Sequence, residues 1–194
     1  MKIGFIGAGK VAQTFARYFL QHGHEVVLSN SRGPESLDNL AKTLGPKARA
    51  ASVQEAADQE LVILAVRWPQ AEQALAQVPD WNGRILVDAT NRPLDQDATR
   101  TASEVIADYA PGARLVKALN TLVVDWIEDD ADPKPELVLF LSGDDAEAKQ
   151  KLAAVLQPGF FPVDLGGLVA GGKLQQFGGP LSGLHLDLIK QLKF

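Results

Sequence analysis

The sequence contains no cysteine. This absence excludes disulfide bonds, iron–sulfur clusters, zinc sites built from thiolates and any mechanism with a cysteine nucleophile. Histidine is scarce as well, because only His22, His24 and His185 occur, and their spacing matches no zinc motif. We therefore expect no metal site, and a stability that rests on a hydrophobic core, which 194 residues suffice to build.

Positive charge is also in short supply, since 19 Lys and Arg stand against 24 Asp and Glu for a net charge of −5. A nucleic-acid partner is not expected, because such a partner normally requires a basic surface. The longest apolar run, residues 61–66, is far shorter than the roughly 20 residues of a membrane helix. With no signal-peptide pattern at the start, we expect a cytoplasmic protein with no membrane contact.

What the sequence does contain is an alternation of short β-branched runs with longer segments of helical period. This alternation is typical of βα units on a mostly parallel sheet. It predicts an α/β fold of the Rossmann-like, doubly wound class in a single domain over 1–194. An acidic, proline-broken loop at 129–135 sets off 136–194 as a compact C-terminal β-α extension. The expected strands are Lys2–Ile6, Glu25–Ser29, Ala48–Ser52, Leu61–Val66, Arg84–Ala89, Arg114–Leu119, Glu136–Ser142 and Phe160–Leu165.

Helix start and stop signals place four helices. They are one over 11–20 that ends at Gly23, one over 34–44, one opened by Asp144 with Glu147 three residues later, and a last one from about Pro180. The last helix would carry a stripe of four leucines, Leu181, Leu184, Leu188 and Leu192. This stripe and its flank offer more apolar surface than one core contact needs, so we expect a homodimer.

The clearest motif is Gly7-Ala8-Gly9-Lys10-Val11-Ala12, between the first strand and the first helix. It matches the pattern G-x-G-x-x-G/A. The first glycine allows a tight turn, the second lets the backbone approach a pyrophosphate, and the third small residue lets helix and strand pack closely. We predict a dinucleotide site here, formed by Gly7, Ala8, Gly9, Lys10 and Val11; the alternative is a merely structural glycine turn.

The tip of the second strand indicates which dinucleotide is bound. An NAD-selective fold would place Asp or Glu there to accept hydrogen bonds from the ribose hydroxyls. This chain has Asn30, Ser31 and Arg32 instead. Uncharged donors and a guanidinium suit a ribose 2′-phosphate, so NADP(H) is the expected cofactor.

Three further strand ends are predicted to line the same crevice, since ligands of doubly wound sheets bind beyond the carboxyl ends of the strands. The candidates are Ala65, Val66, Arg67, Ala89, Asn91 and Asn120. The polar ones among them could equally serve turns, and Asn120 could cap a helix. Lys117 is either a proton donor in the crevice or the partner of an acid at the sheet edge.

No catalytic side chain stands out. Neither Tyr18 nor Tyr109 is followed four residues later by Lys, so the Tyr-x-x-x-Lys relay of carbonyl reductases is missing. Hydride transfer between NADPH and a flavin-like ring does not need such a relay, because the cofactors carry the chemistry. Residues 166–183 contain seven glycines, whose bare backbone would let a flat ring approach closely; the alternative is a turn-rich surface.

Taken together, these segments resemble the NADP oxidoreductases that depend on the deazaflavin coenzyme F-420, and also the cytoplasmic domains of the STEAP metalloreductases. The segments that carry the resemblance are Gly7–Ala12, Ser29–Arg32, Val66–Pro69, Val116–Thr121, Val163–Gly166 and Gly178–Leu181. The resemblance implies a Rossmann-like domain, often dimeric, that binds NADPH at Ala8, Ser31 and Arg32 and presents the nicotinamide to a second cofactor. Lys10 departs from the family, whose members often have a neutral residue there, and could add a phosphate contact.

The expected function is therefore an oxidoreductase that moves a hydride between NADPH and a flavin or deazaflavin F-420, its small-molecule partner. Two alternatives stay open at this point. One is a non-catalytic NADP(H)-binding sensor or regulatory module. The other is a reductase of small imines or carbonyls, whose known members resembling this chain add a long helical dimer domain.

Overall fold

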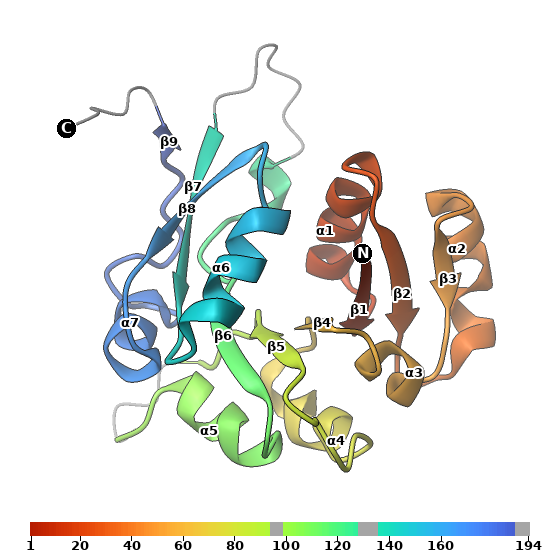
Figure 1. Ribbon diagram of the computed structural model, residues 1–194, viewed down its shortest axis with the longest axis horizontal. Coiled ribbons are helices and arrows are strands. Elements are labelled where there is room, and N and C mark those ends of the chain that lie inside the picture. The colour runs from red at the N-terminus through yellow and green to blue at the C-terminus, as the bar shows by residue number, and fades with distance from the viewer. Residues whose placement is uncertain (94–98, 128–135, 189–194) are drawn as a thin grey trace.

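The computed structural model describes residues 1–93, 99–127 and 136–188 (Figure 1). At its centre is one sheet with the strand order β3-β2-β1-β4-β5-β6-β7-β8, and β9 also pairs with β7. The first six strands are all parallel and follow the order 3-2-1-4-5-6 of the doubly wound fold, which confirms the predicted fold class. The strands are β1 Lys2–Ile6, β2 Glu25–Ser29, β3 Ala48–Ala50, β4 Leu61–Leu64, β5 Ile85–Asp88, β6 Arg114–Ala118, β7 Glu136–Ser142, β8 Phe160–Asp164 and β9 Asp187–Leu188.

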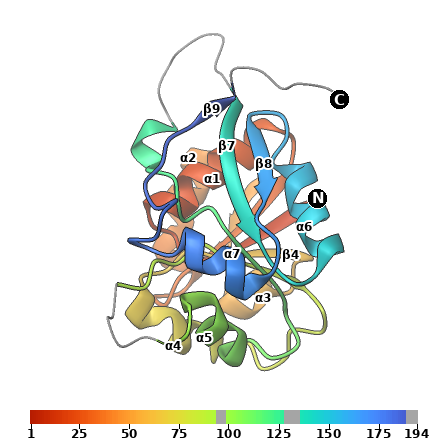
Figure 2. The ribbon, with the colours of Figure 1, turned by 90° about the vertical axis from the view of Figure 1, so that its left-hand side faces the viewer.

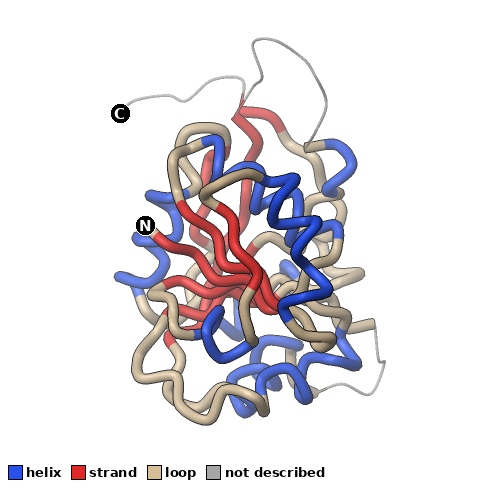
Figure 3. Tube along the Cα trace, turned by 90° about the vertical axis from the view of Figure 1, so that its right-hand side faces the viewer, coloured by secondary structure: helices blue, strands red, loops and turns tan. Residues whose placement is uncertain are grey.

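Helices cover both faces of the sheet (Figure 3). Successive strand residues point to opposite faces, so Ile3 and Phe5 pack with α1 and α6, whereas Ile6 packs on the side of α3, α4 and α5. Burial on both faces explains why the strands read as nearly continuous apolar runs. The helices are α1 Lys10–Gln21, α2 Asp38–Leu44, α3 Val53–Ala57, α4 Ala71–Leu75, α5 Ala102–Tyr109, α6 Ala146–Val155 and α7 Leu168–Gln175.

The predicted strands all occur, and each of their ends lies within two residues of the expected position. Gly23, with φ +85°, follows α1 as predicted. The helix expected over 34–44 divides into a 3₁₀ turn, Pro34–Leu37, and α2. The acidic loop at 129–135 lies outside the described residues.

In the extension, the N-terminal cap of α6 differs from the prediction. Asp145 is the cap, and its carboxylate accepts a hydrogen bond from the Ala148 N–H at 2.9 Å. The neighbouring Asp144, which we expected in this role, instead accepts from the Leu168 N–H at 2.9 Å, at the first residue of α7. The carboxylates of two consecutive residues therefore accept hydrogen bonds from the N-terminal ends of two different helices, which the sequence spacing alone did not predict.

The helix predicted from about Pro180 is wrong for the described residues. The chain turns at Gly183, which has φ +74°, and then runs as β9 antiparallel to β7 (Figure 2). The short β6 pairs with β7 only at Ser142 and Leu141, so the beginning of β7 has backbone groups to satisfy on that side. β9 satisfies them, and this tertiary pairing outweighs the helical spacing of the leucines.

Part of the glycine-rich segment 166–183 forms the helix α7, and two of its seven glycines have a packing role. A Cβ on Gly171 would lie 2.4 Å from the Ser142 Cβ, and a Cβ on Gly179 would lie 2.8 Å from the carbonyl oxygens of Leu174 and Lys173. These two glycines make room for neighbouring protein atoms. Their bare backbone is therefore explained by packing, not by the approach of a flat ring.

Candidate dinucleotide-binding site

The glycine loop joins the end of β1 to the start of α1, as predicted. Gly7 has φ +107°, and a Cβ there would lie 2.3 Å from the Ala65 carbonyl oxygen, so only glycine fits this turn. A Cβ on Gly9 would meet no protein atom within 4 Å. Gly9 is also the N-cap of α1, where no side chain caps the helix and no acid occupies the first turn. The first N–H groups of α1 are thus available to an anion beside an open space.

The loop after β2 is organised by the side chain of Asn30. Its Oδ1 accepts from the Arg32 backbone N–H at 2.8 Å, and its Nδ2 lies 2.9 Å from Ser36 Oγ. The Ser36 hydroxyl donates in turn to the Gly33 carbonyl oxygen at 2.7 Å. This small network shapes the backbone that carries Ser31 and Arg32, both of which are exposed.

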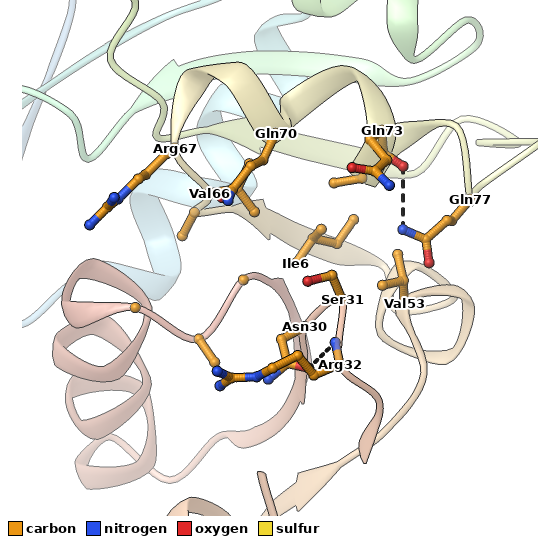
Figure 4. A pocket seen from close by; sticks show the side chains of 15 residues that line it. Ile6, Asn30, Ser31, Arg32, Val53, Val66, Arg67, Gln70, Gln73 and Gln77 are labelled. Atoms are coloured by element: carbon orange, nitrogen blue, oxygen red, sulfur yellow. Dashed lines mark hydrogen bonds between the residues drawn. The ribbon is translucent and has the colours of Figure 1, made fainter. Parts of the chain in front are cut away.

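A cavity of about 380 Å³ brings these two loops together with the end of β4 (Figure 4). Its lining includes nine residues named from the sequence, namely Gly7, Ala8, Gly9, Asn30, Ser31, Arg32, Ala65, Val66 and Arg67. They come from three loops at neighbouring strand ends, which the strand order places side by side. The cavity therefore lies at the carboxyl edge of the sheet, where doubly wound folds bind their ligands.

The wall opposite the glycine loop was not foreseen from the sequence. Val53 begins α3, Gln73 and Ala74 belong to α4, and Gln77 follows it; all four line the cavity with Ile6 and Gln70. In Figure 4, Gln73 and Gln77 lie together on this wall, and Gln77 Nε2 donates to the Gln73 carbonyl oxygen at 3.3 Å. The four-residue spacing of the glutamines was the one available signal, because it places them on one helical face.

Three other predicted residues, Ala89, Asn91 and Asn120, do not line this cavity but lie at the next strand ends. The Ala89 N–H donates to the Leu64 carbonyl oxygen at 3.1 Å, which holds the end of β5 beside the end of β4. Asn91 Nδ2 donates to the Asn120 carbonyl oxygen at 3.2 Å and so connects the ends of β5 and β6. The row of strand ends β1, β4, β5 and β6 is thus continuous from the glycine loop to Asn120.

Lys10 and Val11, the remaining predicted residues, begin α1 beside the glycine loop. Lys10 forms an exposed ion pair with Asp125 of the 3₁₀ turn Val124–Trp126. Val11 is half-buried and packs against the core on the α1 face of the sheet. Neither residue lines the cavity, so their contacts to a phosphate stay a prediction.

Lys117 lies inside the sheet on β6, not at an edge, and it is 1% exposed. Its ammonium group lies 3.2 Å from Asp88 Oδ2 on the adjacent strand and donates to the Thr90 carbonyl oxygen. Asp88 also accepts from the Thr90 N–H and hydroxyl and from the Ser103 hydroxyl. Burial lowers the pKa of Lys117, while the Asp88 charge opposes this shift. Of the two roles considered, pairing with an acid is the one observed.

No three His, Asp or Glu side chains come together in a way that could hold a metal ion in the part of the chain that the structure describes. Within the same residues, no helix is both long and apolar enough to cross a membrane.

The fold and the site together define a class. A glycine loop that borders a cavity, at the carboxyl edge of a sheet with the order 3-2-1-4-5-6, is typical of Rossmann-like dinucleotide-binding proteins. Residues 2–92 match the model of the family described as NADP oxidoreductase, coenzyme F420-dependent. Residues 2–92, slightly less than half of the chain, are thus similar to this family of NADP oxidoreductases.

Two solved structures are similar to the chain over most of its length. A hypothetical protein from Sinorhizobium meliloti is 37% identical, and the match covers 96% of each chain with a TM-score of 0.87. A protein from Arthrobacter sp. proposed to be an F420-dependent NADP-reductase is 29% identical, and that match covers 87% of this chain and 86% of the other with a TM-score of 0.70.

A curated relative is the NAD(P)-dependent glycerol-3-phosphate dehydrogenase 2 of Lactobacillus delbrueckii subsp. bulgaricus. It is 30% identical over a match that covers 73% of this chain. The match covers 51% of the dehydrogenase, so the chain spans about half the length of this relative.

Proposed function

We propose that the protein is an NADP(H)-dependent oxidoreductase that binds the dinucleotide along the row of strand ends. The observation that carries the proposal is the open space at Gly9, because the protein itself gives no packing reason for glycine there. A pyrophosphate would take this space and accept from the first N–H groups of α1. The adenine would then reach the wall formed by Val53, Ala74 and Gln77.

The loop after β2 favours NADP(H) over NAD(H). Arg32 and the Ser31 hydroxyl line the cavity, and no acid replaces them at the tip of β2 to hold free ribose hydroxyls. The guanidinium would form charge-assisted hydrogen bonds with the 2′-phosphate.

Calorimetric titration tests this preference. NADPH should bind at least about tenfold more tightly than NADH, which is about 1.4 kcal/mol. Arg32→Ala should remove most of the difference, whereas Lys42→Ala, which removes an exposed positive charge from α2, should preserve it. Equal affinity of the unmodified protein for both nucleotides would overturn the assignment.

We further propose that the hydride passes between NADPH and a flavin or a deazaflavin such as F-420. The nucleotide and the acceptor ring supply the redox chemistry, and the chain aligns them. In support, two buried titratable side chains, Lys117 and Tyr18, are already engaged by other protein groups. Lys117 is buried against Asp88, and the Tyr18 hydroxyl donates to the carbonyl oxygens of Leu156 and Pro158, with its pKa raised by burial.

Steady-state NADPH oxidation with flavin, deazaflavin and imine acceptors tests the acceptor class. Turnover with the flavin-type rings supports the proposal. Turnover with imines alone would replace it by an imine reductase, and tight NADPH binding without any turnover would replace it by a nucleotide-binding module.

We also propose that the protein forms a homodimer in the cytoplasm. Apart from Met1, the exposed large apolar side chains of the described residues all belong to the extension, and they are Val169, Leu174, Phe177, Leu184 and Leu186. A second copy covering them would remove this surface from water. Sedimentation analysis of the protein and of a Phe177→Ser variant tests the dimer, which should weaken in the variant.

A further inference from the structure

The side-chain amide of Asn120, just beyond β6, forms hydrogen bonds to the described residues through its nitrogen but not through its oxygen. Its Nδ2 donates to the Gln175 backbone carbonyl oxygen at 2.8 Å and to Asn91 Oδ1 at 3.2 Å. Its Oδ1 is buried and accepts no hydrogen bond from the described part of the chain, although the residue is only 7% exposed. A buried amide oxygen without a hydrogen-bond donor destabilises the folded protein, so a donor supplied by a ligand would satisfy it.

Gln175, the last residue of α7, explains why the amide is oriented in this way. It is fully buried, and its Nε2 donates to the Phe140 carbonyl oxygen at 3.0 Å while its Oε1 accepts from Ser142 Oγ at 2.7 Å. These bonds attach the end of α7 to β7 (Figure 2). The backbone carbonyl of Gln175 is thereby held where it engages the Asn120 nitrogen.

The backbone before Asn120 is constrained as well. Leu119 has φ +66°, a left-handed conformation that is unfavourable for a residue with a side chain, and it is 1% exposed. Such strain persists only where the surrounding structure enforces it. The position of Asn120 is thus imposed by its neighbours on both sides.

We propose that Gln175 is a positioning residue that keeps the Asn120 amide nitrogen occupied and leaves its oxygen for the carboxamide NH₂ of the nicotinamide. This inference rests on the proposed function, and the location follows from the row of strand ends that leads from the glycine loop to Asn120. The C-terminal extension then completes the nicotinamide half of a site whose adenosine half lies within residues 2–92.

Two ligands distinguish the nicotinamide half of the site from the adenosine half. NADPH carries both halves, whereas 2′,5′-ADP carries only the phosphorylated adenosine. In Gln175→Met the dissociation constant of NADPH should rise about 5- to 20-fold, the range for loss of one buried hydrogen bond, while that of 2′,5′-ADP should change less than about twofold. Ser142→Ala, which removes one partner of Gln175, should give the same pattern in milder form and serves if Gln175→Met fails to fold.

A control variant distinguishes positioning from loss of stability. Leu152→Val in α6 lowers stability without touching Asn120 and should leave both affinities unchanged. A cycle with Asn120→Ala gives a second readout. Gln175→Met should add little to the NADPH affinity already lost in Asn120→Ala, because the two residues act through one contact.

Three outcomes would overturn the inference. They are equal changes in both affinities for Gln175→Met, no change in either, and full additivity with Asn120→Ala. Failure of the proposed function looks different, because the unmodified protein would then bind neither NADPH nor 2′,5′-ADP.

Discussion

Gly9 in the N-terminal half of the chain and two glycines of the C-terminal extension lack a Cβ for opposite reasons. A Cβ at Gly9 would lie in open space beside the start of α1, whereas a Cβ at Gly171 or Gly179 would collide with protein atoms. The missing Cβ leaves room for a ligand at Gly9 and for neighbouring protein atoms at Gly171 and Gly179. A run of glycines therefore indicates a binding surface only when the space it leaves is not filled by the protein itself.

The largest effect is expected where the two regions meet, at Lys117 on β6. Lys117→Met leaves the buried Asp88 carboxylate without its cation, so the free energy of unfolding should fall by about 3–5 kcal/mol. Urea denaturation measures this. Asp88→Asn in addition should recover part of the loss because no buried charge remains, and a single variant as stable as the original would show that the ion pair is not needed.

The next largest effect is expected on NADPH binding at Gly9, where the missing Cβ leaves room for a ligand. Gly9→Val should weaken NADPH binding by at least about 100-fold, or 2.7 kcal/mol, because the side chain would fill the space for the pyrophosphate. Its melting temperature should not change. Gly7→Ala, with φ +107° and a contact at 2.3 Å, should lose stability as well as binding. Unchanged affinity in a folded Gly9→Val protein would place the nucleotide elsewhere.

Two adjacent glycines in α7 test whether packing explains the glycines of the C-terminal extension. Gly171→Ala brings a Cβ to 2.4 Å from the Ser142 Cβ and should destabilise the fold by about 1–3 kcal/mol, as overpacking does. At Gly172 the added Cβ would have its nearest contact at 3.7 Å, so Gly172→Ala should be neutral or slightly stabilising through its higher helix propensity. Thermal unfolding of the two variants measures this difference. Equal melting temperatures would contradict the packing explanation.

The smallest expected effect is the pH dependence of the contact between β6 and α6. The Arg114 guanidinium, which donates to both carboxylate oxygens of Asp145 at 2.6 and 2.8 Å, holds the pKa of that carboxyl well below its usual range. A lowered pKa in the folded state means that the stabilisation is complete above the unfolded value of about 3.9 and is lost as the pH falls through the folded pKa.

This loss can be followed by thermal unfolding between about pH 6 and pH 2. Asp145→Asn keeps an oxygen for the Ala148 N–H but removes the charge, so its melting temperature should fall less on acidification. The same acid sensitivity in both proteins would exclude a contribution of this pair.

The strands and the N-terminal half of the site could be predicted from the sequence because each depends on adjacent residues. Gly7 and Gly9 define the turn after β1, and Asn30 to Arg32 occupy the tip of β2 without an acid. The opposite wall, with Val53 and Gln77, could not be predicted in the same way. Its residues become part of the cavity only because α3 and α4 lie beside the glycine loop.

The sequence by itself determined the alternation of strands and helices, the glycine loop and the absence of an acid at the tip of β2, since these are set by local backbone freedom and side-chain type. Only the tertiary structure decided how the elements of the C-terminal extension pair and pack. There, β7 pairs with a segment whose leucines have helical spacing, Asp144 accepts a hydrogen bond from the first residue of α7 instead of capping α6, and Gln175 engages β7 and Asn120. Each of these contacts joins residues that are distant in the chain, so its energy depends on which element lies opposite and not on the local pattern.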